Sequence, residues 1–171
     1  PVSGSESAPS GSAAIKTDGT LWVWGNQYQY GQLGQNAPDN LNYSSPVQIP
    51  GTTWGTSLAI GPYNAFAVKT DNTLWSWGEN SGADGMLGHN NNTRYSSPTQ
   101  VPGTTWSRVA IGSYNMLATK TDGTYWTWGW SYQGALGQNN VAKYSSPVQL
   151  PGTWSEEIGG ANMNAMGIRL E

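Results

Sequence analysis

The chain has 171 residues, of which 36% are hydrophobic and 10% are charged, so the composition suits one globular domain and excludes a disordered polyelectrolyte. Seven basic and ten acidic residues give a net charge of −3 without any basic cluster, which argues against nucleic acid as a partner. Cysteine is absent, which excludes disulfides and thiolate metal sites, and no apolar run reaches the roughly 20 residues that insertion as a membrane helix requires.

The N-terminal residues differ in composition from the rest of the chain. Residues 1–12 are rich in Ser, Gly and Pro and have no hydrophobic period, so we predict a flexible arm or linker. Residues 13–171 contain three sequence blocks that recur three times in the same order. We therefore predict three tandem repeat units, at approximately residues 16–68, 69–119 and 120–171.

Each unit begins with a predicted β-hairpin. The turn dipeptides, Asp-Gly at 18–19 and 122–123 and Asp-Asn at 71–72, supply the positive φ that a tight turn requires. After each turn, two tryptophans alternate with other residues, so both lie on one face of the second strand. Their repetition in every unit favours packing between repeats over stacking against sugars. The predicted core tryptophans are Trp22, Trp24, Trp75, Trp77, Trp126 and Trp128.

A variable turn follows the second tryptophan of each hairpin. Loops on a rigid scaffold often carry binding residues, and this turn holds aromatic residues that do not repeat from unit to unit. Tyr28, Tyr30, Trp130 and Tyr132 are therefore candidate ligand-facing residues, with packing of the loop itself as the alternative.

Long polar loops come next in the first two units. They contain the sequons Asn-Tyr-Ser at Asn42 and Asn-Asn-Thr at Asn91, whereas the third unit has Lys143 at this place. An exposed loop admits a glycan without displacing the core. Asn42 and Asn91 are thus candidate N-glycosylation sites.

A Ser-Pro block follows the polar loop and introduces the next predicted strands. Taken as one blade, these strands are residues 47–49, 57–60, 65–70 and 73–78. The prolines suit an edge strand, where a missing N–H donor does little harm. Four short strands in about 50 residues are typical of a β-propeller blade. We predict an all-β fold of about three blades of four antiparallel strands, with thirteen strands in the chain.

The middle unit carries the repeat in full. Its string Leu-Trp-Ser-Trp-Gly at 74–78 is followed by Gly-Met-Leu-Gly at 85–88 and by Ser-Pro at 97–98. These blocks resemble the repeat of the regulator of chromosome condensation family, and the resemblance extends over residues 13–170. It implies a β-propeller, with functions that range from nucleotide exchange on small GTPases to bacterial, viral and extracellular roles. Members of the exchange-factor type close about seven blades in one chain, whereas this sequence holds about three.

An arc of three blades leaves unpaired strand edges at both flanks. We therefore predict an incomplete ring that another copy of the chain completes, in a head-to-tail homo-oligomer or a fibre. The strands predicted to make this contact contain Leu21, Trp22, Val23 and Trp24 at one flank and Met166, Ile168 and Leu170 at the other.

Catalysis finds little support in the sequence. His89 is the only histidine, and no Gly-Xaa-Ser-Xaa-Gly nucleophile motif accompanies it. Glu79 and Asp84 lie close together in the middle unit alone, which leaves a lone calcium or acid–base role as a thin alternative. We predict that the protein is not an enzyme and that it has no cofactor and no metal site.

The low charge, the loops rich in Asn, Thr and Ser, and the incomplete ring together predict a non-enzymatic module for self-assembly and adhesion. We expect this module outside the cell or on a cell or virion surface, as the subunit of a fibre or appendage. One alternative is a lectin-like propeller that binds glycans through its loop aromatics. A second alternative, by fold analogy alone, is a guanine nucleotide exchange factor for a small GTPase.

Overall fold

The fold is given by a computed structural model, which describes residues 11–37, 41–81, 85–112, 114–161 and 164–169. Most of the predicted arm, residues 1–10, lies outside the described residues, and Gly11 and Ser12 belong to the first strand. No helix within the described part of the chain has the length and apolar character to span a membrane.

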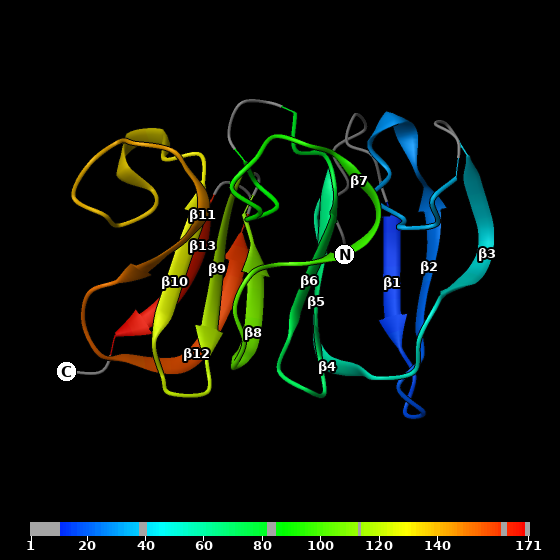
Figure 1. Cartoon of the computed structure of the whole chain (residues 1–171), viewed down its shortest axis with the longest axis horizontal. Helices are drawn as coiled ribbons and strands as arrows, with labels where there is room; N and C mark the ends of the chain where they lie inside the picture. Colours follow the sequence, from blue (N-terminus) through cyan, green and yellow to red (C-terminus); the bar gives the residue numbers. More distant parts are fainter. Residues whose placement is uncertain (1–10, 38–40, 82–84, 113, 162–163, 170–171) are drawn as a thin grey trace.

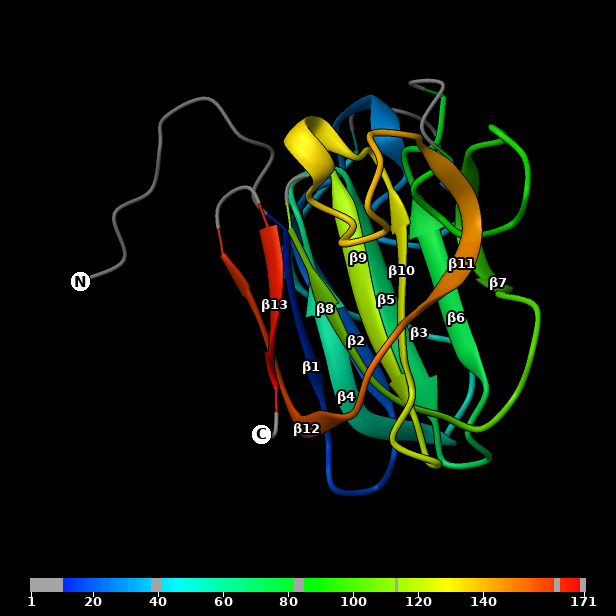
Figure 2. The ribbon, with the colours of Figure 1, turned by 90° about the vertical axis from the view of Figure 1, so that its left-hand side faces the viewer.

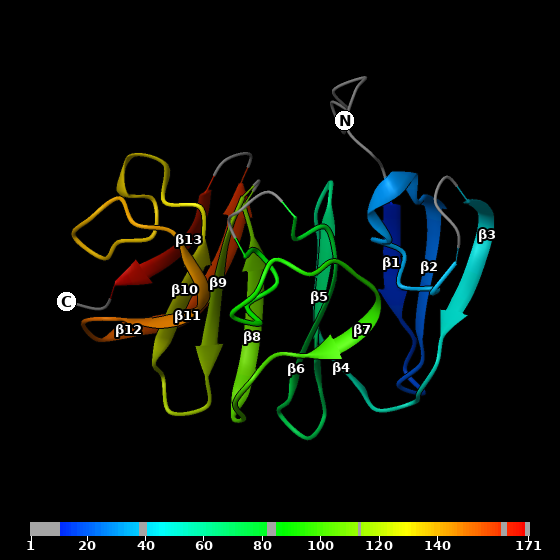
Figure 3. The ribbon, with the colours of Figure 1, turned by 45° about the horizontal axis from the view of Figure 1, so that its top comes forward.

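The described residues form thirteen strands in four antiparallel sheets that stand side by side (Figure 1, Figure 3). The first sheet contains β1 (Gly11–Ile15), β2 (Leu21–Asn26) and β3 (Asn42–Ile49). The second contains β4 (Trp54–Ile60), β5 (Asn64–Lys69), β6 (Leu74–Gly78) and β7 (Tyr95–Gln100). The third contains β8 (Trp106–Ile111), β9 (Asn115–Lys120), β10 (Tyr125–Gly129) and β11 (Tyr144–Leu150). The last contains β12 (Trp154–Ala161) and β13 (Asn164–Arg169).

The predicted all-β fold of four-stranded antiparallel blades is confirmed. The second and third sheets are complete blades, and the first and last sheets have three and two strands in the described residues. Strands β12 and β13 lie against β8 and β9 of the third sheet (Figure 2). The chain therefore forms part of a propeller ring.

The structure corrects which strands share a blade. The Ser-Pro strand pairs with the tryptophan strand before it, so β3 lies beside β2 with Ile49 opposite Leu21. Likewise, Tyr95 of β7 pairs with Gly78 of β6. The prediction that residues 47–49 and 57–60 share a blade is wrong. The long loop after β2 returns the chain to the same sheet, where residues 47–49 pair as part of β3, and residues 50–53 then cross to the next blade. The proline of this strand lies at the outer edge of the sheet, where its missing donor is harmless.

The hairpin turns have the predicted turn chemistry. In the second blade, Asp71 Oδ1 accepts hydrogen bonds from the Thr73 backbone N–H at 3.1 Å and from the Thr73 hydroxyl at 2.6 Å. The Trp75 indole N–H donates to that hydroxyl at 2.8 Å, and Lys69 Nζ lies 3.8 Å from the Trp75 ring centroid. The hydrogen bond from Thr73 lowers the pKa of Asp71. The other two hairpins repeat this arrangement, so the recurring aspartates are explained by turn geometry.

The second tryptophan of each pair joins neighbouring blades. Trp77 is fully buried, and its indole N–H donates to the backbone oxygen of Gln32 in the first blade at 2.8 Å. Trp128 makes the same bond to Met86 of the second blade, also at 2.8 Å. Trp24 has the equivalent position in the first sheet and is half-buried, as are Trp22, Trp75 and Trp126. Blade stacking therefore uses one tryptophan of each pair as a core residue and a hydrogen-bond donor.

A third tryptophan completes the core of the second blade and of the third blade, and the sequence analysis did not single it out. Trp54 is 3% exposed and meets the edges of Trp75 and Trp77, with ring centroids 6.2 Å apart in both pairs. Trp106 has the same place in the third blade and is 1% exposed. The repeated string Pro-Gly-Thr-Thr-Trp at 50–54 and 102–106 is the sequence signal that indicates these residues.

Candidate functional site

The strands run between two ends of the molecule with different character (Figure 1). One end, here called the hairpin end, carries the three aspartate turns after β1, β5 and β9. The other, the loop end, carries the turns after β4 and β8 and the long loops after β2, β6 and β10. These loops include the 3-10 helices η1 (Tyr28–Tyr30) and η2 (Tyr132–Gly134). The sequence varies most from unit to unit in these long loops.

Five aromatic side chains form a continuous row across the loop end. Tyr63 and Tyr114 stack with an interplanar angle of 22° and ring centroids 6.0 Å apart. Tyr30 meets Tyr63 edge-on at 5.2 Å, and Trp130 meets Tyr114 edge-on at 5.3 Å. Tyr132 continues the row from Trp130 at 5.4 Å. We call Tyr30, Tyr63, Tyr114, Trp130 and Tyr132 the aromatic row.

Two members of the row come from equivalent turns of neighbouring blades. Tyr63 precedes Asn64 at the start of β5, and Tyr114 precedes Asn115 at the start of β9. In each turn a glycine N–H donates to the asparagine backbone oxygen at 2.8 Å, which fixes the tyrosine at the loop end. Side-by-side packing of the blades then brings the two rings together. The sequence analysis missed both tyrosines, although the repeated Tyr-Asn dipeptide at 63–64 and 114–115 marks them.

A hollow of about 440 Å³ lies at one end of the row. Its walls are Tyr114, Asn115, Trp130, Tyr132 and residues 133–135. The backbone N–H of Trp130 donates to the Tyr114 backbone oxygen at 2.8 Å, and the N–H of Ala135 donates to the Tyr132 backbone oxygen at 3.0 Å. These bonds hold the walls in place. The hollow therefore offers a preformed aromatic surface to a ligand.

A larger hollow, of about 680 Å³, lies between the first two sheets. Lys16, Trp54 and Lys69 line it. Both lysine ammonium groups lie over the tryptophan rings of their own hairpins, at 3.9 Å from the Trp22 centroid and 3.8 Å from the Trp75 centroid. These side chains belong to the repeated hairpin structure, so we regard this hollow as a consequence of blade stacking.

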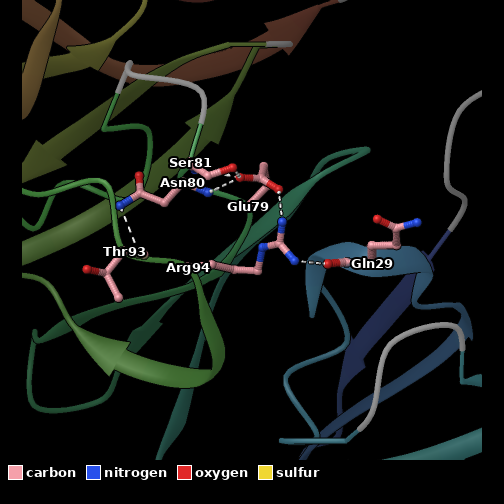
Figure 4. Close-up of polar contacts among 6 residues, drawn as sticks. All are labelled: Gln29, Glu79, Asn80, Ser81, Thr93 and Arg94. Atoms are coloured by element: carbon pink, nitrogen blue, oxygen red, sulfur yellow. Dashed lines mark hydrogen bonds and ion pairs between the residues drawn. The ribbon is translucent and has the colours of Figure 1, made fainter.

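A polar clasp fixes the other end of the aromatic row (Figure 4). Arg94 Nη2 lies 2.9 Å from Glu79 Oε2, and the same guanidinium donates to the backbone oxygen of Gln29 in η1. The guanidinium also lies 5.7 Å from the centroid of the Tyr30 ring. The loop after β6 in the second blade is thereby tied to the loop after β2 in the first blade.

Two further residues anchor the clasp to its own blade. The Ser81 hydroxyl donates to Glu79 Oε1. Asn80 Nδ2 donates to the backbone oxygens of Asn91 at 2.9 Å and Thr93 at 3.0 Å. Thr93 directly precedes Arg94 in the chain. The arginine and glutamate therefore stand on loops that are themselves held by buried amide hydrogen bonds.

Glu79 makes this clasp sensitive to acid. Burial raises the pKa of Glu79, but the hydrogen bonds from Ser81 and the charge of Arg94 outweigh burial and leave the pKa below its ordinary value of 4.5. As the pH falls below about 4.5, the carboxylate of Glu79 is protonated more readily in the unfolded chain than in the folded chain. The free energy of unfolding therefore decreases.

We expect the free energy of unfolding of the wild type to fall as the pH drops below about 4.5, and the variant Glu79→Gln to show a weaker fall in the same range. At neutral pH the variant should be less stable by about 1–2 kcal/mol, because it loses a charged hydrogen-bond acceptor. Urea unfolding of both proteins between pH 7 and pH 3 measures this difference. Parallel pH profiles would contradict the assignment of acid sensitivity to Glu79.

The other predicted site residues lie apart from the aromatic row or outside the described residues. The side chain of Tyr28 lies outside the described residues, as do the side chains of Met166 and Ile168 and the whole of Leu170. Asn42 is exposed at the start of β3. Asn91 is half-buried, and its amide Nδ2 donates to the Tyr95 hydroxyl at 3.3 Å and to the His89 backbone oxygen at 3.3 Å.

His89 is engaged in the structure of its own blade. The fully buried Ser76 hydroxyl donates to the Leu87 backbone oxygen at 2.8 Å, so His89 Nε2, 2.9 Å away, is the donor to Ser76 Oγ. Burial lowers the pKa of His89. Since Ser76 has no access to solvent, this pair cannot act on a substrate. Asp84 lies outside the described residues, and among those described no cluster of three or more histidine and carboxylate groups is arranged to hold a metal ion.

Comparison with known sequences identifies the repeat. The family model of the regulator of chromosome condensation (RCC1) repeat matches residues 18–68, 71–118 and 122–158. The mitochondrial RCC1 domain-containing protein RUG3 of Arabidopsis thaliana is 30% identical over 125 residues, which are 68% of this chain and 28% of RUG3. Protein pim1 of Schizosaccharomyces pombe is 29% identical over 132 residues, 69% of this chain and 24% of pim1. A Caenorhabditis elegans homolog of the X-linked retinitis pigmentosa GTPase regulator is 29% identical over 104 residues, 52% of this chain and 7% of that protein.

Comparison with solved structures identifies the same fold. The crystal structure of human WBSCR16 superposes with a TM-score of 0.78 at 21% identity and covers 94% of this chain and 42% of that protein. Prp20p from Saccharomyces cerevisiae, whose structure is described with its binding to Gsp1p and histones, has a TM-score of 0.76 at 20% identity, covering 96% of this chain and 43% of Prp20p. Another structure of Prp20 contains it bound to Kap60. The chain thus spans less than half of each of these proteins.

These comparisons correct the predicted partners. The prediction that another copy must complete the ring is wrong. The similar protein Prp20p binds other proteins. The similar structures are also more than twice as long as this chain, so a partial arc is no argument for self-association. The first flank agrees with this correction. Leu21 and Val23 are fully buried against Trp54, Ala65 and other residues of the second blade, so they are not available to another subunit.

The predicted function and location are also wrong. The matched relatives include a mitochondrial protein and a GTPase regulator homolog, which gives no support to a fibre, an adhesin or an extracellular or surface location. The glycan-binding alternative finds no support among these proteins either. The exchange-factor alternative stays a hypothesis from fold analogy, because this chain spans only 24% of pim1 and 43% of Prp20p.

Proposed function

Because the chain belongs to the regulator of chromosome condensation (RCC1) repeat family, we propose that it is part of a regulatory propeller that binds another protein through its loop end. The aromatic row is the proposed contact surface. We propose binding rather than catalysis as its action, because the Ser76 hydroxyl that His89 contacts is fully buried. The similar protein Prp20p, which binds Gsp1p and histones and forms a complex with Kap60, gives a precedent for protein partners.

The observation that carries this proposal is the aromatic row with its hollow. Tyrosine and tryptophan are enriched at the centres of protein interfaces, because they bury a large area and still donate hydrogen bonds. Tyr132 is 54% exposed although it belongs to a continuous ring cluster. The hairpin end differs, because lysines of the same hairpins lie 3.8 to 4.4 Å from the ring centroids of its half-buried tryptophans, closer than Lys143 lies to Trp130, at 5.5 Å. The loop end is therefore the end with aromatic surface left for a partner.

Site-specific photo-crosslinking tests the proposal. A benzophenone amino acid is placed at Tyr132 at the loop end or at exposed Thr121 at the hairpin end, and each protein is irradiated in an extract of its source cells. We expect a discrete crosslinked protein from position 132 that is lost when Trp130 is also replaced by alanine. Equal crosslinking from both positions, or none from position 132, would contradict the proposal.

A further inference from the structure

We propose that the hollow beside Trp130 is an aromatic cage for the trimethylammonium group of a methylated lysine on the partner protein. This inference rests on the proposed function and names the side chain that the partner inserts at the loop end. Its basis is the set of rings around the hollow, the charge of the lining, and the cations that this protein already places over tryptophan rings.

Three aromatic side chains line this one hollow of about 440 Å³. Tyr114 and Trp130 meet at an interplanar angle of 76°, and Trp130 and Tyr132 at 56°, with ring centroids 5.3 and 5.4 Å apart. The rings are therefore inclined to one another around the hollow and do not form a flat stack. Aromatic rings on several sides of a hollow are the arrangement that binds quaternary ammonium groups.

The lining of the hollow is uncharged. Besides the three rings, the described residues that line it are Asn115, Gln133, Gly134 and Ala135. An unmethylated ammonium group is compact and strongly hydrated, and no carboxylate among these residues compensates for the loss of its water. A trimethylammonium group has no N–H donors and is weakly hydrated, so attraction to the rings outweighs its loss of water. The lining therefore selects the methylated form of a lysine.

The protein already places lysine cations over its tryptophan rings. At the hairpin end, Lys69 Nζ lies 3.8 Å from the centroid of Trp75. At the loop end, Lys143 Nζ lies 5.5 Å from the centroid of Trp130, and Lys143 is not part of the lining of the hollow. Trp130 therefore attracts a cation from outside the hollow and can attract another from within it. The net charge of −3 also favours the approach of a cation.

The cage is preformed and accessible. Tyr114 is stacked on Tyr63 with centroids 6.0 Å apart, and its backbone oxygen accepts the Trp130 backbone N–H at 2.8 Å. Tyr132 is 54% exposed and Gln133 is also exposed, so a side chain from a partner reaches the hollow past them. Gln133 has a φ of +50°, a conformation that glutamine rarely adopts and that is typical of residues held in place at ligand sites.

Titration of the full chain with peptides tests this inference. The ligand is the peptide Ala-Ser-Lys-Ser-Ala with a trimethylated lysine. One control has the unmethylated lysine, and the other has the neutral isostere in which carbon replaces the quaternary nitrogen. The NMR signal of the Trp130 indole N–H reports binding. The trimethylated peptide should bind at least about tenfold more tightly than either control, because the isostere keeps the shape and loses the charge. Equal affinities of the trimethylated and neutral peptides would make the hollow an apolar socket and overturn the inference.

Choline distinguishes a lysine side chain from a free quaternary amine. It carries the same trimethylammonium group but has no peptide backbone to contact the exposed Tyr132 and Gln133. We expect choline to bind more weakly than the trimethylated peptide. Choline binding as tight as that of the peptide, or tighter, would contradict a protein ligand.

Matched variants locate the cage. Tyr132→Ala should weaken binding of the trimethylated peptide about tenfold, whereas Tyr132→Phe keeps the ring and should bind within about twofold of the wild type. Trp126→Ala, in the same blade at the hairpin end, should leave the affinity unchanged. Tyr132 is mostly exposed, so both of its variants test the cage in a folded chain. Equal losses in Tyr132→Ala and Tyr132→Phe, or in Tyr132→Ala and Trp126→Ala, would overturn the assignment to this hollow.

The peptide titration and the photo-crosslinking separate this inference from the proposed function. If the three peptides bind alike or do not bind, the inference fails. The proposed function still holds in that case, provided that position 132 crosslinks a protein. If position 132 also crosslinks no protein, both fail.

Discussion

Alanine in place of Trp77 should lower the free energy of unfolding by about 3–5 kcal/mol, because it empties a large volume at the junction of the first two blades. The substitution also removes the indole donor and leaves the Gln32 backbone oxygen without this bond. Both effects act between blades rather than within one sheet. Urea unfolding followed by tryptophan fluorescence gives the value, with circular dichroism as a second probe.

Trp24→Ala is the matched control for this prediction. Trp24 has the same repeat position but is half-buried, so its loss should cost only about 1–2 kcal/mol. Similar costs for the two variants would show that burial between blades is not what stabilises Trp77.

Gly85→Ala should destabilise the fold by about 3 kcal/mol or more. A Cβ atom at this position would lie 2.1 Å from Ser145 Cβ and 2.4 Å from Ser145 Cα, so backbone of the third blade would have to move. The same contact region includes the Asn90 N–H, which donates to the Ser145 backbone oxygen at 2.7 Å. Gly85 also has a φ of +59°, which adds strain for any other residue. Thermal and urea unfolding measure the loss.

Gly134→Ala separates the clash from the strain. Gly134 has the equivalent repeat position and a φ of +81°, but the nearest atom to its added Cβ is the Asn140 backbone oxygen at 3.8 Å. We expect a loss of about 1–2 kcal/mol from backbone strain alone. A loss as large as that of Gly85→Ala would rule out close blade contact as the cause.

Local features of this protein could be predicted from its sequence. The hairpin turns depend on an aspartate and a threonine two positions apart, so the bonds of Asp71 with Thr73 follow from short-range geometry. The number of strands and the blade type followed in the same way from the repeat and its period of two. The pairing of the strands could not be predicted in this way. The Ser-Pro strand can pair with the hairpin before it or with the strands after it, and the fold of the long loop decides between the two.

The candidate site could be predicted only in part. Tyr30, Trp130 and Tyr132 were candidates because their rings do not repeat, yet Tyr63 and Tyr114 join the row only when two blades stack. The clasp is still less visible in the sequence, since Arg94 and Gln29 are separated by 65 positions and meet across a blade junction. Contacts of this kind arise from packing and leave no pattern along the chain. The self-assembly prediction was wrong for a different reason, because it took the number of blades in this sequence as the number in the ring.

Hydrogen–deuterium exchange of the chain with and without its crosslinking partner tests the central claim, that the loop end is the binding surface. The account predicts slower exchange on binding in the loop-end residues 61–64 and 130–135, and unchanged exchange in the hairpin turns at 16–20, 70–73 and 121–124. Slower exchange confined to the hairpin turns, with the loop end unchanged, would contradict it.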